Sequence, residues 1–199
     1  GHPNLKGMAT ENIVALCDVD WKYADPCFKD FPAARRYYDW RQMYDEMGKS
    51  IDAVMVATAD HTHAAISAHA ITLGKHVYCQ KPLTHHVSEA RAMRKLAEDK
   101  NLITQMGIQC HSSDEYRKAV LLIRSGIIGR VSCVRAWSPK NWGFDGPAPV
   151  GSDPVPENLN WNLWLGTSPE NGWRGYPCSG CPGSRYCGAG GSWPQSGAW

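Results

Sequence analysis

The stretch Ile51-Asp52-Ala53-Val54-Met55-Val56-Ala57-Thr58, residues 51–58, decides the fold. It is a short, almost wholly apolar run, and such runs are typical of strands that are buried on both faces of a parallel sheet. Residues 62–73 follow with the spacing of a helix, which Gly74 ends. A buried strand that leads directly into a helix predicts one unit of a parallel α/β sheet.

The same alternation extends to both sides of this unit. Further strands are predicted over residues 12–17, 34–39, 76–79 and 102–106, and further helices over residues 40–47 and 87–100. Right-handed crossovers then give a doubly wound parallel sheet, in which the first strand lies between the second and the fourth. The glycine-rich loop of that fold lies about 20 residues before an acidic strand end, so we expect the loop and the first strand to precede Gly1. The predicted fold is α/β, a doubly wound (Rossmann) sheet that lacks its first strand.

The pattern changes after residue 108, where we place a domain boundary. Residues 1–108 are interpreted as an N-terminally truncated dinucleotide-binding domain, and residues 109–199 as the incomplete start of a second domain. The second part begins with a predicted helix to about Ser125 and a predicted strand over residues 130–137. After Ser168 the chain is rich in Gly, Ser, Cys, Pro, Trp and Arg, so we expect a disordered tail. The two alternative explanations of that composition are a disrupted reading frame and a divergent native loop.

Composition argues against several classes of partner. The 21 basic and 19 acidic residues leave a net charge of +2, which predicts no nucleic-acid partner. No apolar run approaches the roughly 18 residues of a membrane span. The chain does not begin with Met, so we expect it to start inside a longer gene product, and both a cytoplasmic and an exported location stay open. Three tail cysteines (Cys178, Cys181, Cys187) lack a fourth ligand nearby, so we predict no metal.

An acidic residue, Asp18, directly follows the apolar run over residues 12–17. At this place a dinucleotide fold uses a carboxylate to accept hydrogen bonds from the adenosine ribose. The alternative is an ordinary turn or helix-cap aspartate. No Arg follows in residues 19–21, and a negative Asp18 would repel a 2′-phosphate, which favours NAD over NADP.

Polar residues also follow the next two predicted strands. Thr58 and His63 lie where a helix opens at the ligand-binding edge of the sheet, although a solvated cap is the alternative. Gln80 and Lys81 follow the strand over residues 76–79. Lys81 could contact the nicotinamide ribose and a substrate hydroxyl there, whereas most lysines are solvated surface groups.

The block Gly74-Lys75-His76-Val77-Tyr78-Cys79-Gln80-Lys81-Pro82-Leu83, with His63 before it and Ser88-Glu89-Ala90-Arg91 after it, resembles the glucose-fructose oxidoreductase and inositol dehydrogenase family (Gfo/Idh/MocA). Leu163-Trp164-Leu165-Gly166 is similar to a Trp-rich subgroup of that family. The resemblance runs from about Ile13 to Gly166. It implies an NAD(P)-binding domain followed by an α+β domain, with a sugar or cyclitol as the substrate.

The resemblance also implies roles for individual residues. Asp18 would hold the ribose, Thr58 and His63 would line the dinucleotide, and Gln80 would keep hydrogen bonding beside it. Lys81 would face the reacting carbon as the catalytic residue, and Gln109 would pass near the nicotinamide.

Two departures from the family pattern are visible. Ala59 and Gln80 stand where the family usually has Pro and Glu, and the tail supplies neither the Asp nor the His expected in the second domain. We therefore expect a hydride-transferring dehydrogenase, homo-oligomeric when intact, of which these 199 residues are an inactive part. An NAD-dependent glycosidase of the same family and a catalytically inactive dinucleotide-binding fragment are the alternatives.

Overall fold

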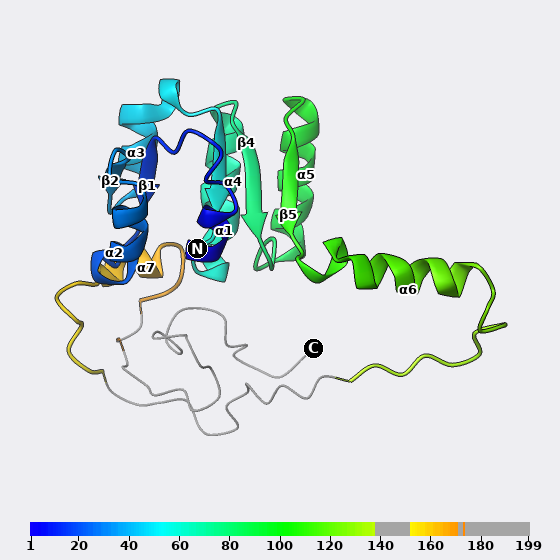
Figure 1. Cartoon of the computed structure of the whole chain (residues 1–199). Coiled ribbons are helices and arrows are strands. Elements are labelled where there is room, and N and C mark those ends of the chain that lie inside the picture. The colour runs from blue at the N-terminus through cyan, green and yellow to red at the C-terminus, as the bar shows by residue number, and fades with distance from the viewer. Residues whose placement is uncertain (138–151, 171–172, 174–199) are drawn as a thin grey trace.

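The computed structural model describes residues 1–137, 152–170 and 173 (Figure 1). Strands and helices alternate along the first of these ranges. The strands are β1 (Ala15–Cys17), β2 (Arg35–Tyr37), β3 (Ala53–Val56), β4 (His76–Gln80) and β5 (Thr104–Gly107). The α-helices are α1 (His2–Lys6), α2 (Trp21–Asp30), α3 (Trp40–Met47), α4 (His63–Thr72), α5 (Val87–Asp99), α6 (Asp114–Arg124) and α7 (Trp161–Leu165). Three short 3-10 helices are η1 (Gly48–Ser50), η2 (Asp60–Thr62) and η3 (Cys110–Ser112).

The strands form two parallel sheets. β1 pairs with β2, and β3, β4 and β5 pair in that order. β1 and β3 each have one neighbour, and the described chain has no strand between them (Figure 1). This is the order of a doubly wound sheet on either side of its central first strand. The fold predicted from the alternating pattern is therefore confirmed.

Local sequence signals explain where the helices begin and end. The Asp20 carboxylate accepts from the backbone N–H of Tyr23 at 2.9 Å and caps α2, while Asp39 caps α3 in the same way. Helix α4 ends before Gly74, whose φ of +80° lies in the left-handed region that glycine tolerates best. The caps satisfy N–H groups that have no partner within the helix.

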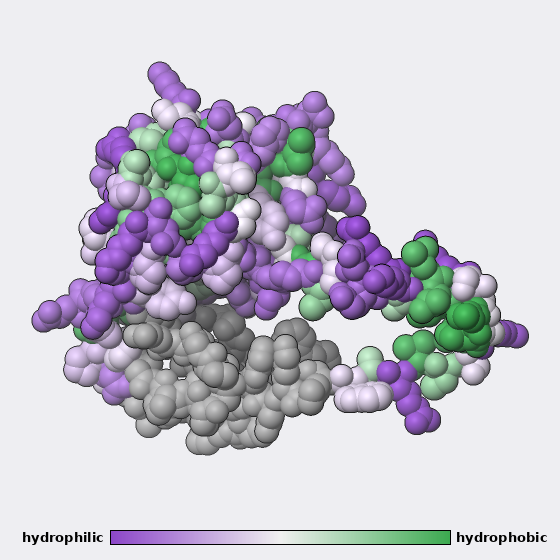
Figure 2. Space-filling view, viewed as in Figure 1, coloured by the Kyte–Doolittle hydropathy of each residue, from purple (hydrophilic) through white to green (hydrophobic). Residues whose placement is uncertain are grey.

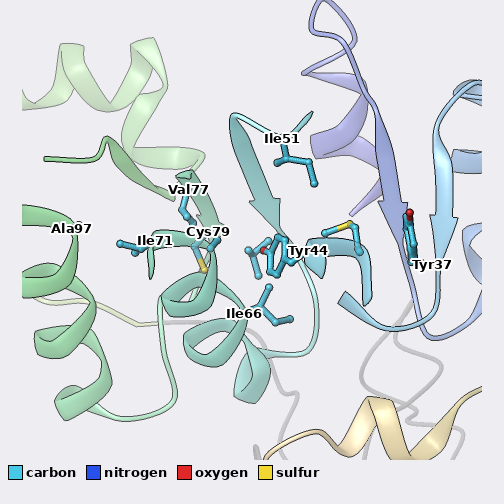
Figure 3. Close-up of a cluster of buried hydrophobic side chains, with 11 residues drawn as sticks. Tyr37, Tyr44, Ile51, Ile66, Ile71, Val77, Cys79 and Ala97 are labelled. Atoms are coloured by element: carbon cyan, nitrogen blue, oxygen red, sulfur yellow. The ribbon is translucent and has the colours of Figure 1, made fainter. Parts of the chain in front are cut away.

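The core lies between the three-stranded sheet and helices α4 and α5, and it extends to α3 and β2. Figure 3 shows Ile71, Val77 and Cys79 together on the α4 and β4 side, with Tyr44 beside Ile66. Ile71 is fully buried and Cys79 is nearly so. Burial of a side chain of this size contributes about 1.5–3 kcal/mol, so this cluster fixes the positions of the strand ends.

The second part of the chain differs from the prediction in one element. Helix α6 forms as expected, although none of its residues is buried and it extends away from the sheets (Figure 1). The strand predicted over residues 130–137 is wrong, because this segment forms no strand and is exposed throughout its described length. A strand needs a hydrogen-bonded neighbour, and no described segment pairs with it.

The C-terminal predictions are tested only in part. Helix α7 returns to the N-terminal part of the chain and lies beside α2 (Figure 1). Cys178, Cys181 and Cys187, and most of the tail expected to be disordered, lie outside the described residues. Within the described ranges no helix is long and apolar enough to cross a membrane.

Candidate functional site

The predicted site residues follow strand ends on one edge of the fold. Asp18 directly follows β1, Thr58 comes two positions after β3, and Lys81 directly follows β4. Gln80 is the last residue of β4, and Gln109 comes two positions after β5. Because paired parallel strands end at the same edge, residues from β3, β4 and β5 are brought to one side of the sheet.

Asp18 is held in a tight turn rather than at a helix cap. Its carboxylate accepts from the backbone N–H of Asp20 at 2.9 Å, and its own N–H donates to the carbonyl of Tyr37 at 3.1 Å. Burial raises the pKa of the Asp18 carboxyl above its ordinary value. The cap of α2 belongs to Asp20, and the contact of Asp18 with a ribose stays a prediction. The turn fixes the carboxylate where ligand hydroxyls could donate to it.

Thr58 presents a hydroxyl at the end of β3. Its Oγ1 lies 2.7 Å from Oγ1 of Thr62, whose own hydroxyl donates to the carbonyl of Ala59 at 2.8 Å. Since Thr62 has one proton, Thr58 is the donor in the pair. The exposed Thr58 oxygen is thereby oriented and keeps its capacity to accept a hydrogen bond from a ligand.

His63 is buried between two loops of the edge. It is 1% exposed, with Nδ1 2.6 Å from the carbonyl oxygen of Pro82 and Nε2 3.2 Å from that of Thr58. The ring therefore links the loop after β3 to the loop that carries Lys81. Both ring nitrogens face backbone oxygens, so the predicted contact of His63 with the cofactor stays a prediction, and its described contacts position other groups.

Gln80 joins three parts of the fold through its side-chain amide. Oε1 accepts from Nδ2 of Asn4 at 2.7 Å, and Nε2 donates to the carbonyl of Gly107 at 3.4 Å. A carboxylate could accept from Asn4 but has no proton to donate to Gly107. A Cβ at Gly107 would lie 2.6 Å from Oη of Tyr78, so a larger residue there would displace the ends of the Tyr78 and Gln80 side chains. The role of Asn4 was not predicted.

Lys81 and Gln109 are exposed at the same edge. Lys81 precedes a cis peptide bond to Pro82, and the ion pairs of the described chain do not include it. Its amine is thus not committed to a carboxylate. In the described ranges no three His, Cys, Asp or Glu side chains gather as metal ligands.

Two buried residues of the edge, Asp20 and His61, form hydrogen bonds with residues more than 100 positions later in the chain. Asp20 accepts from Nδ2 of Asn158 at 2.8 Å, and His61 Nε2 lies 3.0 Å from the carbonyl oxygens of Trp164 and Leu165. Asp20 and His61 are buried, at 3% and 6% exposure. Local sequence patterns do not predict contacts between residues that are more than 100 positions apart.

Comparisons with known proteins bear on the fold and on the chemistry. A model of an oxidoreductase family with an NAD-binding Rossmann fold matches residues 2–108. The chain is 32% identical over 124 residues to a levoglucosan dehydrogenase from Pseudarthrobacter phenanthrenivorans, a match that covers 59% of this chain and 31% of that protein. It is 28% identical over 138 residues to an inositol 2-dehydrogenase from Salmonella typhimurium, covering 65% of this chain and 40% of the relative.

Solved structures agree with these relatives. The myo-inositol 2-dehydrogenase of Lactobacillus plantarum superimposes with a TM-score of 0.55 at 26% identity, over 60% of this chain and 35% of that one. This chain therefore spans between 31% and 40% of the length of these three proteins.

Proposed function

Since the chain belongs to the Gfo/Idh/MocA oxidoreductase family, with its NAD-binding Rossmann fold, we propose that the intact protein oxidises a hydroxyl of a sugar or cyclitol. The cofactor supplies the hydride acceptor, and the protein supplies position and charge. The observation that carries the proposal is the series of polar residues, from Asp18 to Lys81, that follow successive strand ends.

The residues present fit a dinucleotide. Asp18 would accept from the adenosine ribose hydroxyls, and its negative charge opposes a 2′-phosphate, so we propose NAD as the preferred cofactor. Thr58 would accept from a second donor of the ligand. Gly107 lets the side chains of Tyr78 and Gln80 pack directly against the end of β5. Gln109, exposed after β5, would border the nicotinamide end.

Lys81 is the proposed catalytic residue. When a carbinol becomes a carbonyl, its hydroxyl proton must leave as the hydride leaves the carbon. The Lys81 amine would take up that proton, or stabilise the developing oxygen charge, because no described carboxylate neutralises it. Gln80, being neutral, adds no charge beside it.

The test is Lys81→Ala in the intact protein, with Lys95→Ala as the control. Turnover should fall by about 100-fold or more while NAD binding stays within a few fold, as for loss of a proton-transfer group. Lys95 is an exposed lysine paired with Asp99 on α5, and its removal should change neither quantity. Near-normal turnover in Lys81→Ala would remove Lys81 from the mechanism. Net NADH release with a polyol, rather than recycling of the cofactor, separates a dehydrogenase from the NAD-dependent glycosidase alternative.

A further inference from the structure

One segment of the chain contacts both loops that carry the proposed nucleotide ligands. It runs over residues 156–168, includes α7, and is called the strap below. At its first end, Leu159 forms a bridge with Asp20 and the N–H of Asn160 donates to the carbonyl of Val19 at 2.9 Å. The side chain of Asn158 adds a hydrogen bond of 2.8 Å to the Asp20 carboxylate.

The second end of the strap is held by His61. Its Nε2 lies 3.0 Å from the last two carbonyl oxygens of α7, those of Trp164 and Leu165. Such terminal carbonyls have no partner within their helix. Because both neighbours are acceptors, Nε2 must carry the proton and donate to them. Thr167 in turn donates through Oγ1 to the carbonyl of His61 at 3.3 Å.

The two anchors flank the residues assigned to the cofactor. Val19 and Asp20 immediately follow Asp18, and the Asp20 N–H is the donor that holds the Asp18 carboxylate. His61 directly precedes Thr62, whose hydroxyl orients that of Thr58. One anchor therefore lies after β1 and the other after β3, the two strands that do not pair with each other.

The hydrogen bond from His61 to Leu165 is buried, and those of His61 to Trp164, Asn158 to Asp20 and Thr167 to His61 are partly buried. Asp20, His61 and Thr62 are 3%, 6% and 8% exposed, and Leu159 and Leu165 of the strap are 5% and 6% exposed. Loss of one partner of a buried hydrogen bond leaves the other partner unsatisfied, which favours a shift of the loop that carries it toward another partner or water. A released strap would thus let the turns after β1 and β3 shift independently.

We propose that the strap sets the separation of the Asp18 and Thr58 loops, and that Asp20 and His61 are positioning residues for the adenosine half of the dinucleotide. This rests on the proposed function. Neither residue needs to touch the cofactor, because each acts through its neighbour. Gln80 ends β4 and Lys81 follows it, and the strap contacts involve neither residue. His63 lies against both the Thr58 and the Pro82 carbonyl oxygens, so the nicotinamide half should respond to the strap much less than the adenosine half.

The experiment compares binding of NAD, AMP and nicotinamide mononucleotide to the intact protein and to two variants, Asn158→Ala and His61→Ala. We expect NAD and AMP to bind about 5–20-fold more weakly in each variant, the size of one or two lost hydrogen bonds. Nicotinamide mononucleotide should bind within about 2-fold of the wild type. His61→Gln, which keeps a side-chain N–H donor, should restore most of the AMP affinity.

Controls and contrary outcomes separate positioning from stability. His111→Ala removes an exposed histidine whose ring contacts Tyr116 and which forms none of the strap contacts, so it should change no affinity. Should His61→Ala fail to fold, Asn158→Ala and His61→Gln carry the test. Unchanged NAD affinity in the folded variants, or equal weakening of AMP and nicotinamide mononucleotide, would overturn the strap proposal alone. Absence of NAD binding by the wild type would overturn the proposed function and this inference with it.

Discussion

Gln80→Glu is the substitution that examines the site most directly. The amide of Gln80 both accepts from Asn4 and donates to the carbonyl of Gly107, and a carboxylate can do only the first. Losing the donor should cost about 1 kcal/mol, at the lower end for a buried acceptor because the bond is long at 3.4 Å. The charge-assisted bond to Asn4 offsets part of this. We expect a net destabilisation of about 0.5–1 kcal/mol, or a fall in Tm of roughly 1–4 °C.

The same change should alter catalysis in a direction that stability alone does not explain. A carboxylate beside Lys81 favours the charged form of the amine. An amine that must accept a proton then becomes active only at higher pH, so the turnover profile should move to higher pH. Gln105→Glu is the matched control, because Gln105 is exposed on neighbouring β5 and its amide also donates to a backbone carbonyl. Its stability should change by no more than about 0.5 kcal/mol.

Thermal unfolding of both variants measures the change in stability, and pH profiles of turnover measure the shift in activity. A Gln80→Glu protein as stable as the wild type would show that the Gly107 contact contributes nothing. A profile moved to lower pH would refute the assignment of Lys81 as the proton acceptor. Equal effects in the two variants would mean that added charge on the sheet, rather than the position of Gln80, is responsible.

Three further predictions concern Asp18, the pH dependence of stability and the 199-residue chain by itself. Asp18→Ala in the intact protein should weaken NAD binding by about 10-fold and reduce the ratio of NAD affinity to NADP affinity, which titrations of both cofactors measure. Tighter binding of NADP than of NAD by the wild type would contradict the role of Asp18. Asp18→Asn should raise the free energy of unfolding at neutral pH, and this gain should disappear as the pH falls through the raised pKa of Asp18. Asp39→Asn should lower the free energy of unfolding at neutral pH, because hydrogen bonding to Arg41 lowers the pKa of Asp39, and the difference from the wild type should disappear in acid. The 199-residue chain by itself should unfold with weak cooperativity and bind no NAD, since no strand of the described residues pairs with the facing edges of β1 and β3. Each backbone group left without a partner there costs up to about 1–3 kcal/mol, against a net stability of about 5–15 kcal/mol for a domain. A sharp two-state melt of a monomer that binds NAD would contradict it.

The sequence was informative wherever a local pattern determines the structure. The apolar run over residues 51–58 predicts a strand, and β3 lies within it. The predicted burial holds only in part, because Val56 is buried, Val54 and Met55 are half-buried and Ala53 is exposed. The places of Asp18, Thr58 and Lys81 at strand ends follow from the same alternation. The strand over residues 130–137 was wrong because its pattern is local while strand formation depends on a partner.

Long-range hydrogen bonds were not predictable. Asn4 and Gln80 are 76 positions apart, and Asn158 and Asp20 are 138 apart. Asparagine and glutamine are common surface residues, so neither pair carries a signal that distinguishes it from solvated polar groups. The same holds for His61, whose partners are backbone carbonyls that every residue type supplies.

Burial separates two kinds of polar residue at this edge. Thr58, Lys81 and Gln109 are exposed and keep hydrogen-bonding capacity for a ligand, whereas Asp20 and His63 are 3% and 1% exposed and bond to the protein. A buried polar group must be satisfied within the fold, so it can position a neighbour but has little left to offer a ligand. Asp18 is intermediate, because one oxygen holds its turn while partial burial raises its pKa and leaves the carboxylate less well solvated than in water. A poorly solvated acceptor gains most from new donors, which is the condition under which two ribose hydroxyls would bind it well.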